Sequence, residues 1–345
     1  MSDNVSDEEQ QQQMEELFIC ADIWLEVFAF LDPVKLGLKM ALISDRFDVL
    51  VDEHFKLRKW SLSWLQIRRA IGGNGAQIVN RRSGELLPIP QGPLPDKVIG
   101  FEQIQISYVD KTVIEFLQRI RRLFDSAETN VYLATLTISD DSLEIVWQKI
   151  WPFVSDNIWG FLDYFVLDNF RKFSPTVLRN CAKLRRIFSF GLFPEFPAED
   201  NADASSGQAL AKWLITARED DRPKTLRCVF SSTGMEGLKA AFVNASEQVN
   251  FIIKCWAYDG EVVPFELENN WTGERLTLRQ MDERWWLLVR CPIVREEDKW
   301  AKWEEEAIEW GSLSGWNLIS IGFDDWDIGD GMLDENDDGP SEPRK

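Results

Sequence analysis

Histidine is almost absent from this sequence, and cysteine is scarce and scattered. Among 345 residues there is one histidine, His54, and the five cysteines stand far apart at Cys20, Cys181, Cys228, Cys255 and Cys291. Catalytic triads, Cys–His dyads and the common zinc sites need histidine beside other functional groups. Thiols without CxxC spacing are typical of reduced cysteines in a cytoplasmic or nuclear protein. The sequence therefore predicts no catalytic residue, no metal ligand and no cofactor site, and His54 is interpreted as a residue of the surface or the core edge.

Long apolar runs and an excess of basic charge are also missing. No run reaches the roughly 18 apolar residues of a membrane span, and the first residues are acidic and rich in glutamine, unlike a secretory signal. Basic residues number 38 against 58 acidic ones, which gives a net charge of −20. Because phosphate backbones repel such a chain, we expect neither a nucleic acid nor a membrane as its partner. The acidic ends, residues 1–16 and 324–345, are predicted to be a disordered leader and a disordered tail.

Residues 17–70 have the apolar periodicity of helices. In DIWLEVFAFLD, apolar side chains recur at helical spacing at Ile23, Val27, Phe30 and Leu31. Asp32-Pro33 combines an N-cap residue with a proline suited to the first helical turn. Ser44 can cap a further helix. This pattern predicts a bundle of three short helices, the last of which continues into LRKWSLSWLQIRRA (57–70).

Residues 71–100 interrupt the helical pattern. The run Gly72-Gly73-Asn74-Gly75 lacks the spacing of a nucleotide-binding loop and is interpreted as a turn. The segment AQIVNRRSGELLPIP (76–90) has the pattern of a hairpin that turns at Ser83-Gly84. The proline-rich PIPQGPLP (88–95) then predicts a rigid connector.

From residue 101 to residue 258, strand-like and helix-like runs alternate. Strands are predicted at 101–109, 131–138, 164–169, 186–193, 225–230 and 250–258, and helices at 112–124, 142–151, 174–184 and 208–217. Alternation of this kind indicates parallel strands joined by crossovers. A weak leucine-rich pattern within residues 133–141 leaves two architectures open, a degenerate leucine-rich-repeat-like solenoid and an open parallel sheet.

Residues 259–323 have a different character. Three short strands are predicted to form an antiparallel meander, with the first two joined at Asn-Trp-Thr-Gly (270–273). A helix at 295–310 follows, with one stripe formed by Trp300, Trp303, Ala307 and Trp310. Core packing is the favoured interpretation of this stripe, and a partner surface is the alternative. The predicted fold class is therefore α+β or α/β, with an N-terminal helical domain, a strand–helix body, a small meander and a C-terminal helix.

A motif lies within the predicted helical bundle. Residues 19–57 read ICADIWLEVFAFLDPVKLGLKMALISDRFDVLVDEHFKL. This segment resembles the F-box, whose pattern runs Leu-Pro-x-Glu-Leu-Leu-x-x-Ile-Phe-x-x-Leu-Asp-Pro-x-x-Leu before a hydrophobic-Arg-aromatic block. The matching residues are Ile19, Asp22, Ile23, Val27, Phe28, Leu31, Asp32, Pro33, Leu36, Leu42, Arg46 and Phe47. Ile19-Cys20 stands where the pattern has Leu-Pro, and the later block is slightly displaced.

The rest of the chain resembles an expanded family of nematode F-box proteins, notably those of plant-parasitic cyst nematodes. The blocks that carry this resemblance are IVNRRSGELLPIPQGPLP, ENNWTGERLTLR, WWLLVRCPI, REEDKWAKWEEEAIEW and GDGMLDEN. The resemblance implies a non-catalytic substrate receptor of the SCF (Skp–cullin–F-box) ubiquitin ligase, located in the cytoplasm or the nucleus.

The resemblance also implies the partners and the residues that meet them. A Skp-type linker would contact an apolar surface formed by Ile19, Ile23, Phe28, Leu31, Pro33, Leu42 and Phe47. Through the linker the chain would reach cullin, and its C-terminal body would hold a protein target that the sequence does not identify. Two alternatives stay open: residues 19–57 could be a helical cap on the body, and the protein could be a non-catalytic scaffold outside the ubiquitin pathway.

Overall fold

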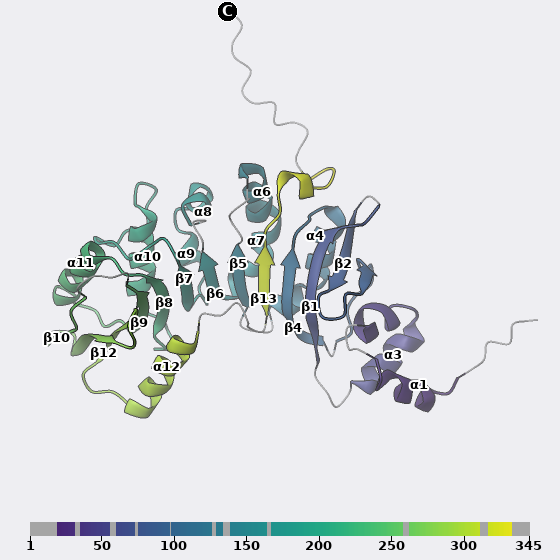
Figure 1. The fold of residues 1–345 in the computed structure, drawn as a ribbon, viewed down its shortest axis with the longest axis horizontal. Coiled ribbons are helices and arrows are strands. Elements are labelled where there is room, and N and C mark those ends of the chain that lie inside the picture. Colours follow the sequence, from purple (N-terminus) through teal and green to yellow (C-terminus); the bar gives the residue numbers. More distant parts are fainter. Residues whose placement is uncertain are drawn as a thin grey trace, which may run out of the picture.

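A single sheet of 13 strands runs through the body of the protein (Figure 1). The computed structural model describes residues 19–31, 35–55, 60–72, 75–96, 98–125, 129–133, 139–163, 167–257, 262–310 and 317–332. The strand order is β10-β11-β12-β9-β8-β7-β6-β5-β13-β4-β1-β2-β3, so the sheet is open. The fold is therefore mixed α/β with an open sheet, and leucine-rich-repeat-like repeats stay a prediction.

The middle of the sheet is parallel and its two ends are antiparallel. Eight strands, from β1 through β4, β13, β5, β6, β7 and β8 to β9, pair in parallel. Strands β2 and β3 add an antiparallel hairpin at one end, and β10 to β12 form the antiparallel meander at the other. The strand bounds are β1 Trp60–Arg69, β2 Ala76–Asn80, β3 Leu86–Pro88, β4 Val98–Ile106, β5 Thr129–Leu133, β6 Ile158–Asp163, β7 Arg186–Ser189, β8 Lys224–Val229, β9 Phe251–Trp256, β10 Phe265–Asn269, β11 Glu274–Gln280, β12 Trp285–Pro292 and β13 Leu318–Ile321.

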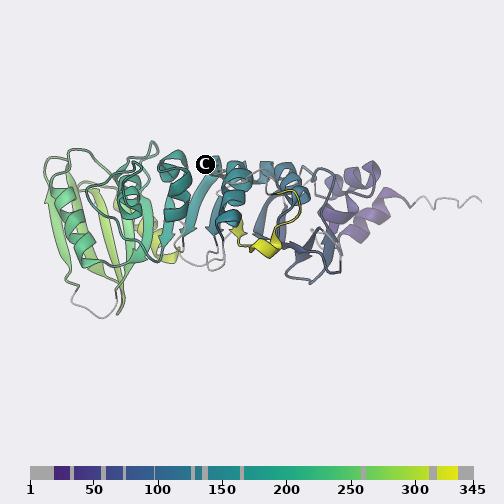
Figure 2. The same ribbon diagram turned by 90° about the horizontal axis from the view of Figure 1, so that it is seen from above.

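Helices precede the sheet and connect its strands. The N-terminal segment contains α1 (Ala21–Phe28), the π-helical turn η2 (Leu36–Met40) and α3 (Asp45–His54). Within the body the helices are α4 Lys111–Arg119, α5 Arg121–Asp125, α6 Asp140–Ile145, η4 Val146–Ile150, α7 Trp151–Val154, η5 Ser155–Asn157, α8 Leu167–Phe173, α9 Val177–Asn180, α10 Ser206–Ile215, α11 Ser232–Val243, α12 Glu297–Glu309 and η6 Asp325–Asp327. Seen from above, helices line one side of the sheet (Figure 2).

The structure corrects the prediction that a helix continues through residues 57–70. Residues 60–69 form strand β1, which pairs with β2 on one side and β4 on the other. Leu65 and Ile67 are buried, whereas Gln66 and Arg68 between and after them are partly exposed. This period of two is the signature of a strand, and backbone partners on both sides decide the local structure.

Other predicted elements were found, displaced or missed. Strands at 101–109, 186–193, 225–230 and 250–258, the 76–90 hairpin, the meander and the C-terminal helix are confirmed. The strand predicted at 164–169 is wrong, because β6 ends at Asp163 and α8 begins at Leu167. Strand β5 is described only to Leu133, so residues 134–138 of that prediction lie outside the described residues. Strand β13 and helix α11 were not predicted.

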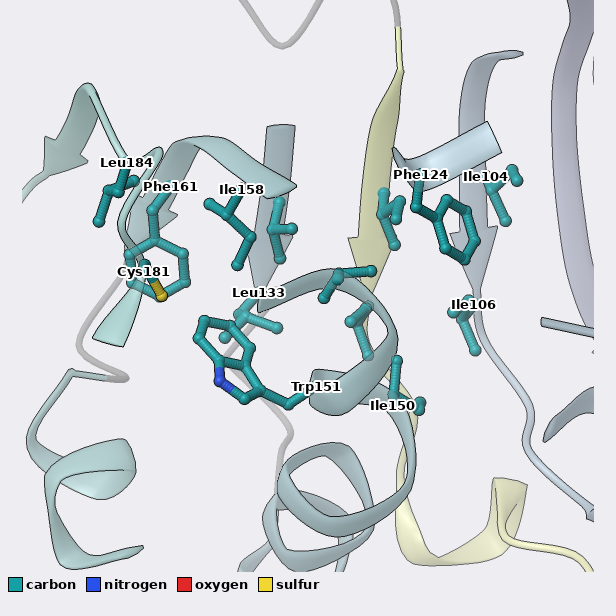
Figure 3. Close-up of a cluster of buried hydrophobic side chains, with 14 of the residues drawn as sticks. Ile104, Ile106, Phe124, Leu133, Ile150, Trp151, Ile158, Phe161, Cys181 and Leu184 are labelled. Atoms are coloured by element: carbon teal, nitrogen blue, oxygen red, sulfur yellow. The ribbon is translucent and has the colours of Figure 1, made fainter. Parts of the chain in front are cut away.

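The two faces of the sheet have separate cores. Strand residues such as Ile104, Leu133 and Leu226 belong to the large core beneath the helices, and Figure 3 shows several of these side chains beside Phe124, Ile150 and Trp151. On the opposite face a small core joins Ile252, Leu287, Val289 and Cys291 to Trp300 and Ala307 of α12. The core role predicted for the tryptophan stripe of this helix is therefore confirmed for Trp300.

The first part of the predicted disordered tail is ordered. Residues 324–332 pack against the loop that follows β4, where Val109 forms a parallel bridge with Ile328. The Val109 amide donates to the Asp327 carbonyl at 2.9 Å, and Met332 is buried. Ile328 and Met332 provide apolar contacts with the core, which the acidic composition of this segment did not predict. Residues 333–345, like the predicted leader 1–16, lie outside the described residues.

Candidate partner-docking site

Helices α1 and α3 of the N-terminal segment pack through aromatic rings. The ring centroids of Trp24 and Phe47 lie 4.9 Å apart in an edge-to-face arrangement, and those of Phe28 and Phe47 lie 6.4 Å apart. His54 meets Phe28 edge to face at 5.9 Å, which places the single histidine at the edge of this cluster. The predicted cap of α3 is present, because the Ser44 side chain accepts a hydrogen bond from the Phe47 amide.

Helix α1 carries apolar side chains on two of its sides and also exposes Asp22 and Glu26. Its inward side carries Phe28, which is 0% exposed, together with the partly buried Trp24. Its outward side continues from the preceding residue Ile19 through Ile23 and Val27 to Phe30, with exposures of 37%, 52%, 39% and 89%. We call these four residues the outer apolar face. Apolar side chains gathered on one side of a helix are normally covered by another part of a protein, so this face has the composition of an interface.

The structure corrects the role assigned to Phe28. This side chain lies in the interior between α1 and α3 and cannot reach a partner while the segment keeps its fold. The reason is the helical period: Phe28 is one position from Val27, and one position turns a side chain by about 100° around a helix. Val27, which matches the motif, and Phe30 were both left out of the predicted contact residues, although both belong to the apolar periodicity of the sequence.

The remaining predicted contact residues differ in accessibility. Ile19 and Ile23 are exposed, as a contact role requires, whereas Leu31 and Phe47 are only partly buried and pack on the core. Leu42 is also partly buried, and Pro33 lies outside the described residues. Beyond α1, two further apolar side chains of this segment are exposed, Ile43 at 59% and Val49 at 67%.

The N-terminal segment is attached to the hairpin and the connector of the body. The ammonium groups of Lys35 and Lys39 lie 3.3 and 3.8 Å from the Glu85 carboxylate. The Leu42 side chain reaches the connector at Gly92, where a Cβ would lie only 3.2 Å from a methyl carbon of Leu42. These contacts use the side of the segment that faces the body and do not involve the outer apolar face.

Four of the five cysteines are buried in the described part of the chain. Cys181, Cys228, Cys255 and Cys291 are buried free thiols, and Cys20 is an exposed one. Burial raises the pKa of Cys181 and Cys255 to about 12, which keeps these thiols protonated and unreactive at neutral pH. The buried position predicted for Cys228 and Cys255 within strands is confirmed.

No group of three or more His, Cys, Asp or Glu side chains in the described ranges is placed to hold a metal ion. None of the helices in this part of the chain combines the length and the apolar composition of a membrane span.

Comparisons with known proteins found no match among protein-family models, curated proteins or solved structures. The functional interpretation therefore depends on the residues and the geometry of this chain.

Proposed function

We propose that the protein is an F-box-type substrate receptor of an SCF-type ubiquitin ligase, acting in the cytoplasm or the nucleus. The observation that carries the proposal is the outer apolar face of α1, formed by Ile19, Ile23, Val27 and Phe30. Large apolar side chains that are exposed together on one face are typical of interaction surfaces. The resemblance of residues 19–57 to the F-box supports a Skp-type linker as the partner.

The proposed role is scaffolding without catalysis by this chain. The linker covers the outer apolar face and connects the protein to cullin, while the body of the protein holds a target. Tethering raises the effective concentration of target lysines near the ubiquitin-conjugating enzyme, which increases the rate of transfer without a new catalytic group. The buried, protonated thiols of Cys181 and Cys255 fit this role, because neither is poised to accept ubiquitin as a thioester.

The attachment of the N-terminal segment to the body through Lys35, Lys39 and Leu42 fits a receptor that presents a target at a defined place. Burial, followed by the charges of Asp96 and Asp45, raises the pKa of Asp48 of α3. The outer apolar face points away from these contacts and stays accessible.

Affinity purification of the tagged full chain from cells tests the proposal. We expect the Skp-type linker and cullin to co-purify with the natural sequence and to be lost with Ile23→Asp, which places a charge in the outer apolar face. Val294→Asp is the matched control, because Val294 is 91% exposed and lies in the loop before α12. Recovery of other partners without linker or cullin from the natural sequence would instead identify a scaffold outside the ubiquitin pathway.

A further inference from the structure

A cavity of about 570 Å³ lies on the helix-covered side of the sheet, between the end of α10 and α11. Exposed residues of the loop after β7 and of α11, among them Pro197 and Asn244, form part of its rim. Its floor is apolar and includes the buried rings of Phe242 and Phe251. Cavities of this volume with an apolar lining and a few polar groups are typical binding sites of small molecules.

A buried arginine also lines this cavity. Arg290 of β12 is 4% exposed, and Glu274 of β11, which is 0% exposed, holds one edge of its guanidinium. Nε of Arg290 donates to Oε1 of Glu274 at 3.2 Å, and Nη2 donates to Oε2 of Glu274 at 2.6 Å and to the Glu247 carbonyl at 2.9 Å. The guanidinium carbon lies 5.2 Å from the centroid of the Phe242 ring and 6.0 Å from that of the Phe251 ring. These contacts fix the plane of the guanidinium.

One corner of this guanidinium is not used by the protein. An arginine side chain carries five N–H donors, and the hydrogen bonds of Arg290 involve only Nε and Nη2. Within the described part of the chain, Nη1 forms no hydrogen bond. An acceptor atom of a ligand inside the cavity can therefore pair with Nη1, and the fixed plane of the guanidinium sets the direction of that hydrogen bond.

The charges around the cavity favour an uncharged ligand. Glu274 already neutralises Arg290, so a ligand carboxylate would lie near a second buried carboxylate and bring no counter-charge with it. The exposed Glu247 at the rim adds another negative charge. A cationic group would instead meet the guanidinium itself. The neutral oxygen of a ketone accepts a hydrogen bond and is free of both repulsions.

We propose that this cavity binds an uncharged small molecule with an apolar body and a carbonyl oxygen that accepts a hydrogen bond from Nη1 of Arg290. The rings of Phe242 and Phe251 contact the body of the ligand, and Arg290 fixes its orientation. The proposal does not depend on the proposed receptor function, because the cavity and helix α1 lie at opposite ends of the molecule (Figure 1).

The test is fluorescence titration of the full chain with prodan, an uncharged naphthyl ketone dye. The comparison probes are dimethylaminonaphthalene, which lacks the ketone, and ANS, an anilinonaphthalene that carries a sulfonate. We expect saturable one-to-one binding of prodan and weaker binding of ANS. Dimethylaminonaphthalene should bind about 10-fold more weakly than prodan, because a hydrogen bond from a charged donor is lost. No saturable binding of prodan, or equal or tighter binding of ANS, would overturn the proposal.

A pair of variants on α11 locates the bound dye. Ala241 lines the cavity, so Ala241→Phe places a ring in the space that the ligand needs and should weaken prodan binding by roughly 10-fold or more. The matched control is Val243→Phe, which adds the same ring at a position of α11 that is 59% exposed and outside the cavity lining. The control should bind prodan like the natural sequence. Unchanged affinity of Ala241→Phe would place the dye elsewhere and contradict the proposal.

The double variant Arg290→Met with Glu274→Gln tests the donor. It removes the guanidinium together with its counter-charge, and it keeps a side-chain oxygen for the Val249 amide, which donates to Glu274 at 2.8 Å. Prodan binding should weaken by about 10-fold and that of dimethylaminonaphthalene should stay unchanged, since only the ketone uses the donor. An equal change for the two dyes, or no change for either, would refute recognition of the carbonyl by Arg290.

Ile23→Asp separates this proposal from the docking of the linker. We expect this variant to lose the linker and to keep its affinity for prodan, because the outer apolar face is not part of the cavity. If the affinity for prodan is lost as well, the dye binds at the outer apolar face and the proposal for the cavity fails.

Discussion

Replacing Phe28 and Phe30 one at a time separates the inner side of α1 from its outer apolar face. The two phenylalanines are two residues apart, yet Phe28 is 0% exposed and Phe30 is 89% exposed. Phe28 packs on the rings of Trp24 at 6.0 Å and His54 at 5.9 Å. Truncation of such a buried ring leaves a cavity and removes its transfer free energy, whereas truncation of an exposed ring removes little.

The magnitudes follow from this difference in burial. Phe28→Ala should lower the free energy of unfolding of the N-terminal segment by roughly 3–5 kcal/mol, the usual cost of a buried phenylalanine. Phe30→Ala should change it by less than about 0.5 kcal/mol. Linker binding should respond in the opposite way, because Phe30 lies at the surface that a partner covers. Loss of a well-covered aromatic contact costs about 2 kcal/mol, which corresponds to a roughly 30-fold weaker affinity.

The assay combines urea unfolding, followed by far-UV circular dichroism, with calorimetric titration of the linker. We expect Phe28→Ala to shift the unfolding transition and Phe30→Ala to weaken only the affinity. Equal stability of the Phe28→Ala variant and the natural protein would refute the interior position of Phe28. A destabilised Phe30→Ala variant would show that the outer apolar face already packs within this chain.

Three further predictions concern the body. Glu274→Gln should lower the free energy of unfolding by roughly 3–5 kcal/mol in urea titrations, because it leaves the buried Arg290, 2.6 Å away, without its counter-charge; a neutral result would contradict this. Burial lowers the pKa of Lys224 to about 7, so above that pH the unfolded chain binds more protons than the folded chain does. The free energy of unfolding should therefore rise by about 1.5 kcal/mol from pH 7 to about pH 8.5. Lys224→Met should abolish this rise, and an equal rise in the variant would disprove its origin. Asn317→Ala should cost roughly 1–3 kcal/mol in thermal unfolding, since the Asn317 side chain accepts from the Phe101 amide at 3.1 Å and anchors β13; an unchanged melting temperature would contradict that anchoring role.

Local patterns predicted those parts of the fold whose partners are close in sequence. The hairpin at 76–90 and the meander could be predicted because a turn between two alternating runs specifies antiparallel pairing. The patterns located most of the parallel strands along the chain, but they did not give the order of those strands in the sheet. Strand β13 inserts between β4 and β5 although nearly 200 residues separate it from β5, and a four-residue run, LISI, carries no signal for that insertion.

The error at residues 57–70 and the error at Phe28 have different physical origins. At 60–69 the apolar residues fit a helix and a strand alike, and pairing with β2 and β4 decides the outcome. At α1 the helix was predicted, but its composition does not say which apolar side packs against α3. The contacts with α3 decide that Phe28 points inward and Phe30 outward.

We propose that the outer apolar face of α1 docks a Skp-type linker, and calorimetric titration of the purified linker into the full chain measures this docking. The expected result is saturable one-to-one binding by the natural sequence and by Val294→Asp, with at least a tenfold loss of affinity in Phe30→Asp and an unchanged unfolding transition in all three proteins. Absence of binding by the natural sequence, or equal affinity of Phe30→Asp, would contradict the claim.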